Sequence, residues 1–266
     1  MKVFLASCLL CAAVPVFAAQ ISPQDLGDLQ ADIVVLGEVH DNPAHHANQA
    51  TVLAALAPRA IVFEMLSPEQ AARVTPDLLA DVVGLGAALE WAASGWPDFT
   101  MYAPLFTAAP GAVIHGAALP RDEVRRAMAD GAAAVFGPDA PVYGLDQPLP
   151  QAEQAAQEAE QMAAHCDALP ADMLPGMVAA QRLRDAAFAR TAIQALEQTG
   201  GPVAVITGSG HARTDRGVPA MIARAAPQVS VLSLGQVEAP ADGPQPFDLW
   251  IVTEPTPRED PCAALR

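Results

Sequence analysis

Acidic and imidazole side chains follow four of the short apolar runs in this sequence, at the point where each run ends. These residues are Glu38 and His40 after the first run, Glu64 after the second, His115 after the third and His211 after the fourth. Carboxylates and imidazoles exchange protons near neutral pH, and both are ligands of divalent metal ions. A group of them could hold a metal with an open coordination position, transfer protons without a metal, or orient a cofactor that carries its own metal.

The apolar runs that carry these residues are typical of buried parallel strands. Their hydrophobicity is continuous rather than alternating, which indicates that other elements cover both faces of the sheet. Ala-rich helical stretches separate them, and the first begins at Asn42-Pro43, a favoured pair for a helix start. The predicted strands are 33–36, 60–63, 112–114, 203–206, 229–232 and 249–252. We therefore expect an α/β fold, in which a mostly parallel sheet is flanked by helices.

Parallel strands would bring the ionisable residues together. The carboxyl ends of such strands meet at one edge of the sheet, where ligands of open α/β sheets bind. Alternation along the first strand puts Glu38 and His40 on the same side. We therefore expect a polar rim along this edge, lined by all five residues.

Two regions do not fit the alternation of strands and helices. Residues 68–108 and 150–198 lack a good strand and are predicted to be helical. We expect one or both to form a smaller helical cap domain over the sheet, within a single domain that spans residues 20–266. Prolines are frequent towards the C-terminus, which predicts loops around the last strand.

Several of these side chains also suit a purely structural role. His115 is followed by Gly116 and a new helix start, which favours such a role, and Glu64 could instead pair with an arginine or with backbone amides. His45 and His46 fall on the first turn of a helix and are expected at the surface. The sequence contains neither H-E-x-x-H nor G-x-S-x-G, so no known hydrolase motif identifies the site.

The composition restricts the partners and the compartment. The 266 residues are 52% hydrophobic and carry a formal net charge of −16, so a nucleic-acid partner is not expected. Lys2 is the only lysine, which excludes a lysine nucleophile from a mature chain that lacks it. Residues 1–19 show the pattern of a secretory signal peptide, with cleavage after Ala18 or Ala19. The protein is therefore expected in the periplasm or in association with the outer membrane.

The cysteines leave two questions open. Residues 5–8 resemble a lipobox, which would make Cys8 a lipidated N-terminus and the protein a lipoprotein. The mature chain keeps Cys166 and Cys262. In an oxidising compartment, this even pair predicts a disulfide that ties the C-terminal tail to the body of the protein. The alternative is a free or ligand-facing Cys166.

Two longer stretches resemble a known family. Residues 32–49, which include GEVHDNPAHHANQ, and residues 208–219, GSGHARTDRGVP, are similar to the ChaN-like haem-binding proteins of the Tiki/ChaN superfamily. Supporting matches are Phe63-Glu64-Met65, Gly95-Trp96-Pro97, Leu119-Pro120-Arg121 and Gln181-Arg182-Leu183-Arg184-Asp185. The resemblance implies a parallel α/β domain with a smaller helical domain, haem bound through a tyrosine, and a role in iron acquisition. It also allows a homodimer and haem-uptake components as partners.

The resemblance assigns candidate roles to particular residues. The chain has two tyrosines, so Tyr102 is the first candidate for the axial ligand of haem and Tyr143 the second. The haem propionates need arginine or histidine partners. His165 is the first candidate for this contact, with Arg184 and Arg213 behind it.

The rim has a second interpretation. The superfamily contains proposed metal-dependent hydrolases with the same Glu-x-His and Gly-x-x-His elements, so Glu38, His40, Glu64 and His211 could hold a divalent metal. Asp185 and the arginine before it would connect the cap to this rim by polar contacts. We therefore predict a haem-binding envelope protein that serves haem or iron uptake, more a binding protein than an enzyme. A metal-dependent hydrolase is the alternative.

Overall fold

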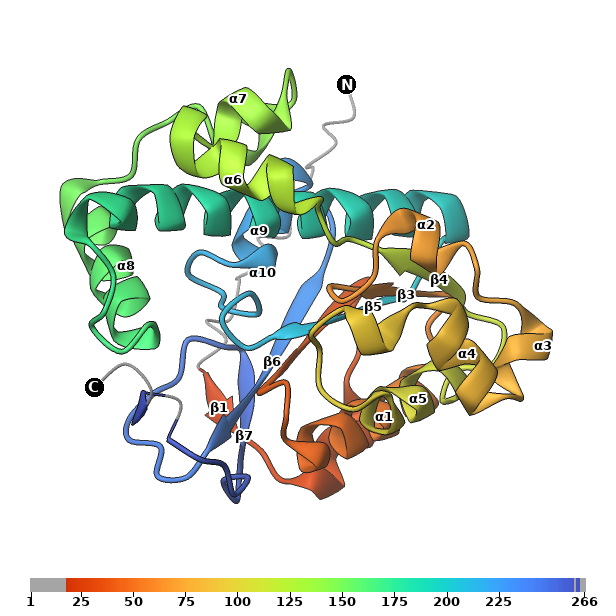
Figure 1. The fold of residues 1–266 in the computed structure, drawn as a ribbon. Helices are drawn as coiled ribbons and strands as arrows, with labels where there is room; N and C mark the ends of the chain where they lie inside the picture. The colour runs from red at the N-terminus through yellow and green to blue at the C-terminus, as the bar shows by residue number, and fades with distance from the viewer. Residues whose placement is uncertain (1–17, 261, 264–266) are drawn as a thin grey trace, which may run out of the picture.

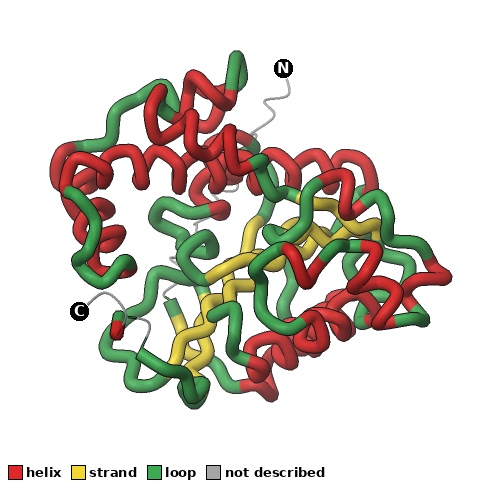
Figure 2. Tube along the Cα trace, in the orientation of Figure 1, coloured by secondary structure: helices red, strands yellow, loops and turns green. Residues whose placement is uncertain are grey.

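The fold is a parallel sheet with helices on both faces (Figures 1 and 2). The computed structural model describes residues 18–260, 262 and 263, so Cys8 and most of the predicted signal peptide lie outside the described residues. In this part of the chain, seven strands follow the order β1-β7-β6-β2-β5-β3-β4, and every neighbouring pair is parallel. The predicted α/β class is thereby confirmed. The same residues contain no helix that is long and apolar enough to cross a membrane.

Each predicted strand is present; β3 has the predicted bounds, and the bounds of the others differ by one to six residues. The strands are β1 (Ala19–Gln20), β2 (Ile33–Glu38), β3 (Ala60–Phe63), β4 (Val113–Gly116), β5 (Val203–Gly208), β6 (Val231–Glu238) and β7 (Leu249–Thr253). β2 and β5 continue past their apolar runs, so that Glu38 and Gly208 are the last residues of these strands. β1 has no hydrophobic signal of its own because it is too short to show a pattern.

Alternate residues of the central strands point into two separate hydrophobic cores. In β2, Val35 joins the core on one face and Val34 joins the core on the other. Helix α9 (Leu174–Thr199) contributes many side chains to the first core. Helices α1 (Pro43–Leu56) and α5 (Phe99–Thr107) pack into the second core, on the opposite face of the sheet (Figure 1). Continuous hydrophobic runs predict this cover on both faces.

The first predicted helical region packs against the sheet. Its helices are α2 (Pro68–Ala71), α3 (Pro76–Leu79), α4 (Val82–Ala88), η2 (Trp91–Ala93) and α5. On α5, Phe106 stacks on Phe63 of β3 with ring centroids 4.6 Å apart, and Tyr102 is fully buried in the same core. These contacts join the region to the hydrophobic core beside β3.

The second helical region supplies both a cover for the sheet and a projecting helix. α9 lies across one face, and α8 (Gln151–Ala164) packs against α9 and projects from one end of it (Figure 1). Side chains of α8 therefore face the carboxyl ends of the strands. The remaining helical elements are η1 (Pro23–Asp28), α6 (Arg121–Asp130), α7 (Ala132–Phe136), η3 (Ala140–Tyr143), η4 (Ala171–Met173) and α10 (Val218–Ala225).

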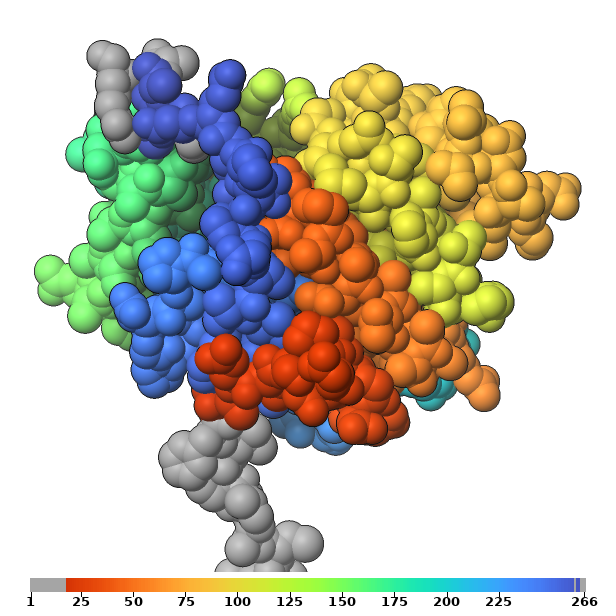
Figure 3. Space-filling model, turned by 90° about the horizontal axis from the view of Figure 1, so that it is seen from below, coloured from red at the N-terminus to blue at the C-terminus, as the bar shows by residue number. Residues whose placement is uncertain are grey.

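The C-terminal tail is held by a disulfide and by ion pairs. Cys166 and Cys262 are joined, which confirms the predicted disulfide. Figure 3 shows the deep-blue C-terminal segment running across the surface beside the green region of α8. Arg258 of this tail bonds to Asp41 and Glu238, and its guanidinium lowers the pKa of Glu238 to about 2. The tail is therefore fastened to the loop that follows β2.

Removal of the disulfide should destabilise the protein. The bridge joins residues 96 positions apart, so Cys262→Ser is expected to lower the free energy of unfolding by about 2–4 kcal/mol, through the larger entropy of the unfolded chain. Urea denaturation under oxidising conditions measures the change. Cys166→Ser is the matched variant and should give the same loss, and the double variant should lose nothing more. Equal urea midpoints for the wild type and both single variants would contradict this prediction.

Candidate functional site

The carboxyl ends of β2, β5 and β3 are neighbours in the sheet, and they bring most of the predicted polar rim together. β5 lies between the other two strands, and Glu38 is opposite Gly208 in the register. A cavity of about 400 Å³ lies at this edge, with side chains of α8 and α9 on its other side. We call it the rim cleft. It is lined by His40, Glu64, Gln157, Glu160, Gln161, Ala164, Gln181, Arg184, Gly208, Gly210, His211 and Arg216.

Glu38 is buried and directs both carboxylate oxygens at neighbouring side chains. Its Oε1 accepts hydrogen bonds from the Tyr102 hydroxyl at 2.6 Å and from His40 Nδ1 at 2.8 Å. Its Oε2 faces His46 Nδ1 at 3.5 Å. Only 2% of Glu38 is exposed. Glu38 therefore orients His40 and does not itself present an oxygen to the cleft.

His40 is more accessible than the other histidine of the rim cleft. Its side chain is 35% exposed, against 9% for His211. Since Nδ1 is bonded to Glu38, Nε2 is the nitrogen left for a ligand. Trp96 packs edge-on against the ring, with 4.8 Å between centroids. Burial lowers the pKa of His40, but the bond to Glu38 and the charge of Glu64 outweigh burial and hold the pKa above its usual value.

Gly208 leaves room for the His40 ring and helps to hold Glu64. A Cβ atom at position 208 would lie 3.0 Å from His40 Nε2, closer than side chains normally pack. The backbone N–H of Gly208 and the hydroxyl of Thr207 both donate to Glu64 Oε2, at 2.8 and 2.6 Å. Burial raises the pKa of Glu64, but His211, His40 and these two bonds outweigh burial and keep the pKa below its usual value. Glu64 is therefore a carboxylate inside the cleft.

His211 is held between two carboxylates. Its Nδ1 donates to Asp185 Oδ1 at 2.6 Å, and its Nε2 lies 3.6 Å from Glu64 Oε1. The Gln181 side-chain amide also lies 3.0 Å from Nδ1. Burial lowers the pKa of His211, but the charges of Glu64 and Asp185 outweigh burial and raise the pKa above its usual value. Like His40, His211 is therefore oriented by a carboxylate at Nδ1.

A second cavity, of about 280 Å³, shares Glu64 and Arg184 with the rim cleft. Trp96 and Leu119 give it apolar walls, and Arg121 adds a second guanidinium. Among the described residues, neither arginine belongs to an ion pair. The site therefore offers free positive charge beside apolar surface, although the chain as a whole is acidic.

The structure does not support the prediction that Glu38, His40, Glu64 and His211 hold a divalent metal. Within residues 18–260, 262 and 263, no group of three or more His, Cys, Asp or Glu is placed to hold a metal ion. The physical reason is visible at Glu38, whose two oxygens both face other side chains. Its role is to orient an imidazole rather than to bind a ligand.

Both tyrosines are buried. Tyr102 is fully buried, its hydroxyl donates to Glu38, and burial raises the pKa of its phenol far above the usual value. Tyr143 is 7% exposed and packs against Phe136 with 5.0 Å between ring centroids, and burial raises its pKa too. Neither tyrosine lines the rim cleft in this structure.

Other predicted contacts lie outside the rim cleft. His165 ends α8, where its Nδ1 donates to the carbonyl of Gln161. Arg213 makes two hydrogen bonds to the carboxylate of Asp215. His115 lies within β4, and its buried Nε2 has no hydrogen-bond partner in the part of the chain that is described. None of these three predicted residues lines the cleft, so His115 does not join the rim as expected.

The two histidines at the start of α1 are buried, which corrects the expectation of surface positions. His45 accepts a hydrogen bond from the Val39 N–H at Nδ1 and bonds to Thr253 through Nε2, and burial lowers its pKa to about 4. His46 Nε2 donates to the backbone carbonyl of His40. Both rings therefore fix the loop after β2, and with it the position of His40.

One face of α9 closes the cleft, and only some of the residues on this face were predicted from the sequence. The predicted polar contact of Asp185 with the rim is confirmed by its bond to His211, whereas Arg184 lines the cleft and forms no ion pair among the described residues. Gln181 and Phe188 lie on the same helix face and also contact His211, the latter with 4.9 Å between ring centroids. The polar residues at helical spacing among many alanines are the sequence signal for this face.

Taken together, the fold and the cleft define a ligand-binding α/β protein, with its site at the carboxyl ends of parallel strands. The family model described as haem-binding uptake, Tiki superfamily, ChaN matches residues 28–222. The chain therefore belongs to the ChaN family of haem-binding uptake proteins.

The chain is also similar to solved structures. ChaN of Campylobacter jejuni, whose structure is described as showing cofacial haem binding, has a TM-score of 0.62 and 19% sequence identity, over 85% of this chain and 89% of that chain. The type III effector HopBA1 has a TM-score of 0.47 and 14% identity, over 88% of this chain and 92% of that chain. At these identities the likeness concerns the fold alone. No curated protein sequence gives a significant match.

The pairing of Asp185 with His211 can be tested by titration. Asp185→Asn removes a buried negative charge beside the imidazole, so the pKa of His211 is expected to fall. NMR titration of the imidazole resonances measures it. Asp172→Asn, at an exposed position, is the matched control and should leave His211 unchanged. A His211 pKa that is the same in both variants would disprove the pairing.

The pH dependence of stability should change in the same variant. The raised pKa of His211 stabilises the folded chain fully below the ordinary value of 6.5, and this contribution is lost as the pH rises through the folded-state pKa. As the pH rises from the ordinary histidine pKa through the folded-state pKa of His211, the free energy of unfolding should therefore fall less in Asp185→Asn than in the wild type. At the acidic end it should be about 1–3 kcal/mol less stable than the wild type, because a buried bond is weakened. Urea denaturation on both sides of the range measures both effects.

Proposed function

We propose that this protein binds haem in the rim cleft and serves haem or iron acquisition in the cell envelope, as a binding protein rather than an enzyme. Family membership supports haem as the ligand. The observation that carries the placement is His40, whose Nδ1 is fixed by a carboxylate while its ring lines the cleft. Histidine is a common axial ligand of haem iron, and a carboxylate partner at the other ring nitrogen orients such ligands.

The proposed ligand differs from the tyrosine that the resemblance implies. Tyr102 could reach a haem only by leaving both Glu38 and the hydrophobic core. Tyr143 lies in the core on the α9 face of the sheet and does not line the rim cleft. His40 is already accessible and needs no such rearrangement. Tyr102 then has a supporting role, since its hydroxyl holds Glu38 and Glu38 holds His40.

The rest of the cleft fits the other parts of a haem. Arg184 and Arg121 supply guanidinium groups for the propionates, and Trp96 supplies aromatic surface for the macrocycle. The rim cleft, of about 400 Å³, is within the range of sites for organic ligands, and the second cavity, of about 280 Å³, adjoins it. His165 and Arg213, the other candidates for the propionates, do not line either cavity.

The chain's own residues bind and orient, and haem supplies a redox-active iron when it is bound. The hydrogen bond from His40 Nδ1 to Glu38 makes Nε2 a stronger donor to iron. Arg184 places a positive charge where a propionate would otherwise face the carboxylate of Glu64. These residues therefore set the orientation and the strength of binding.

The proposal includes export and partners. Residues 1–19 would direct the chain to the periplasm or the outer membrane, with a lipidated Cys8 as the alternative form. A homodimer is included because the ChaN structure of C. jejuni is described by cofacial haem binding. Two copies of this chain could bring two rim clefts face to face. Haem-uptake components would be the further partners.

Titration of the apoprotein with haemin tests this placement. The Soret band should shift and saturate in the wild type, and His40→Ala should weaken binding by about tenfold or more, because the axial bond is lost. Tyr143→Phe is the matched control and should keep the wild-type spectrum. Tyr102→Phe should still bind haemin but with an altered spectrum, since Glu38 loses a donor.

Two outcomes would overturn the proposal in different ways. A wild-type spectrum in His40→Ala, with binding lost in one of the tyrosine variants, would assign the iron to that tyrosine. No saturable spectral change in the wild type would overturn haem binding itself.

The same cleft favours one other function, acid–base hydrolysis without a metal. His40 and His211 both have raised pKa values, and Glu64 is a carboxylate within reach of His211. An imidazole whose Nδ1 is bonded to a carboxylate, as in both of these histidines, is oriented to act as a general acid or base. This observation supports a proton-transfer site more directly than a metal site.

Hydrolysis of p-nitrophenyl acetate in the presence of EDTA separates the two functions. A hydrolytic site should show turnover that falls by about 100-fold or more in His211→Ala. Haem binding predicts instead that the wild type and His211→Ala are indistinguishable in this assay. Turnover that depends on His211 would therefore favour the enzyme over the binding protein.

A further inference from the structure

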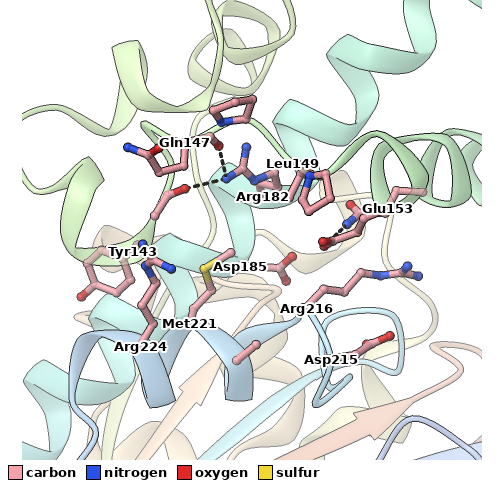
Figure 4. Close-up of a pocket in the computed structure, with 15 residues that line it drawn as sticks. Tyr143, Gln147, Leu149, Glu153, Arg182, Asp185, Asp215, Arg216, Met221 and Arg224 are labelled. Atoms are coloured by element: carbon pink, nitrogen blue, oxygen red, sulfur yellow. Dashed lines mark hydrogen bonds between the residues drawn. The ribbon is translucent and has the colours of Figure 1, made fainter.

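A cavity of about 310 Å³ lies beside the rim cleft, between the loop after η3, α9 and α10 (Figure 4). Arg182 enters it from α9, Arg224 from α10 and Arg216 from the loop before α10. We call it the arginine cavity. It shares Gln157 and Arg216 with the rim cleft, so the two spaces adjoin.

Arg182 is held in place by backbone oxygens rather than by a carboxylate. Its guanidinium donates to the carbonyls of Gly144 and Gln147, at 2.7 and 3.1 Å (Figure 4). Carbonyl groups satisfy the hydrogen bonds of a cation but do not cancel its charge. Burial lowers the pKa of Arg182 and outweighs the charges of Glu153 and Asp146, which act in the opposite direction.

Arg224 packs against the same loop. Gly144 has a φ of +69°, and a Cβ atom there would lie 2.5 Å from Arg224 Nε. Glycine at this position therefore allows both the left-handed turn and the close approach of the guanidinium. The positive charge of Arg224 also lowers the pKa of Arg182. Both guanidinium groups line the same cavity.

The carboxylates of the arginine cavity are already bonded to other side chains. The pairs are Asp185 with His211, Asp215 with Arg213, and Glu153 with Gln157. Arg216 is itself paired with Glu160. Across the described residues, Arg182 and Arg224 belong to no ion pair. The cavity thus holds two guanidinium groups that form no ion pair among the described residues, and the carboxylate nearest in effect, Glu153, acts on Arg182 only through its charge.

We propose that the arginine cavity binds a carboxylate carried on a compact apolar body. Guanidinium groups match the paired oxygens of a carboxylate. The walls formed by Pro148, Leu149 and Met221 suit an apolar group. A volume of about 310 Å³ is at the lower end for sites of organic ligands, which favours a small ligand or one arm of a larger one.

Such a carboxylate has two sources. It belongs either to a free small acid or to a propionate of haem that extends from the rim cleft. The second source rests on the proposed function, and it follows from the wall that the two cavities share. The chemistry at the guanidinium groups is the same in both cases.

Calorimetric titration with 3-phenylpropionate tests the site in the intact protein. The wild type should bind this acid and not the neutral 3-phenylpropionamide. Arg224→Gln should weaken binding by about tenfold or more, since a charge-assisted hydrogen bond is lost. Arg224 is exposed, so its substitution leaves the core intact. Arg125→Gln, at an exposed position of α6, is the matched control and should bind the acid like the wild type.

Several results would overturn the proposal. These are no heat of binding in the wild type, equal binding of the acid and the amide, and unchanged binding in Arg224→Gln. Inorganic phosphate that binds as tightly as the acid would also overturn it, because the apolar walls would then contribute nothing.

Competition with haemin identifies the source. If the carboxylate is a propionate, 3-phenylpropionate should displace haemin and Arg224→Gln should weaken both ligands. If it is a free acid, the acid should bind without changing the haemin titration. If the wild type binds 3-phenylpropionate but no haemin, the carboxylate site is supported and the proposed haem binding is overturned. The failure of one proposal can therefore be distinguished from the failure of the other.

Discussion

The buried carboxylate of Glu38 must be hydrogen-bonded or neutralised, and this requirement fixes the arrangement around the cleft. An ionised carboxylate that leaves water without partners costs several kcal/mol. Here the hydrogen-bond partners are Tyr102 from α5 and His40 from the loop after β2, while the second oxygen, Oε2, has no hydrogen-bond partner among the described residues and lies 3.5 Å from His46 Nδ1 of α1. Glu38 therefore holds α5 and the end of β2 together. The cost of leaving Glu38 unpaired also explains why Tyr102 stays in the core.

His211, the second imidazole of the cleft, is also held by buried carboxylates. His211 is bonded to Asp185 and approaches Glu64, whose other oxygen is held by Thr207 and a backbone amide. Carboxylates and imidazoles therefore alternate along the edge of the sheet, and each charge lies beside one of opposite sign. In a poorly hydrated site such alternation strengthens every bond, and the loss of one member leaves its neighbours uncompensated. The raised pKa values of both histidines follow from this arrangement.

Much of the fold could be predicted because the strands have a strong local signal. The apolar runs, the helix start at Asn42 and the convergence of Glu38, Glu64 and His211 follow from hydrophobicity and from the parallel direction of the strands. The positions of His45 and His46 could not be predicted in this way. Their burial depends on partners that are distant in the sequence or lie in the loop backbone, and no local pattern reveals such partners.

The burial of the two tyrosines also depends on tertiary contacts that the sequence does not show. A resemblance to a family transfers a residue type, whereas ligation depends on where that residue points. Tyr102 has the right chemistry, but its hydroxyl is already the donor that stabilises Glu38. His115 likewise follows the pattern of the rim, but β4 is the edge strand, and its histidine does not reach the cleft. In both cases the deciding fact is a tertiary contact or a place in the strand order.

The net charge of −16 excludes some partners and not others. A polyanion such as nucleic acid meets the field of the whole surface and is repelled. A small anion in a cavity responds mainly to charges within a Debye length of about 10 Å. At that range, the guanidinium groups of Arg184 and Arg182 matter more than distant carboxylates. An acidic protein can therefore bind an anionic ligand such as haem, provided that its few cations gather without partners at the cavities that receive it.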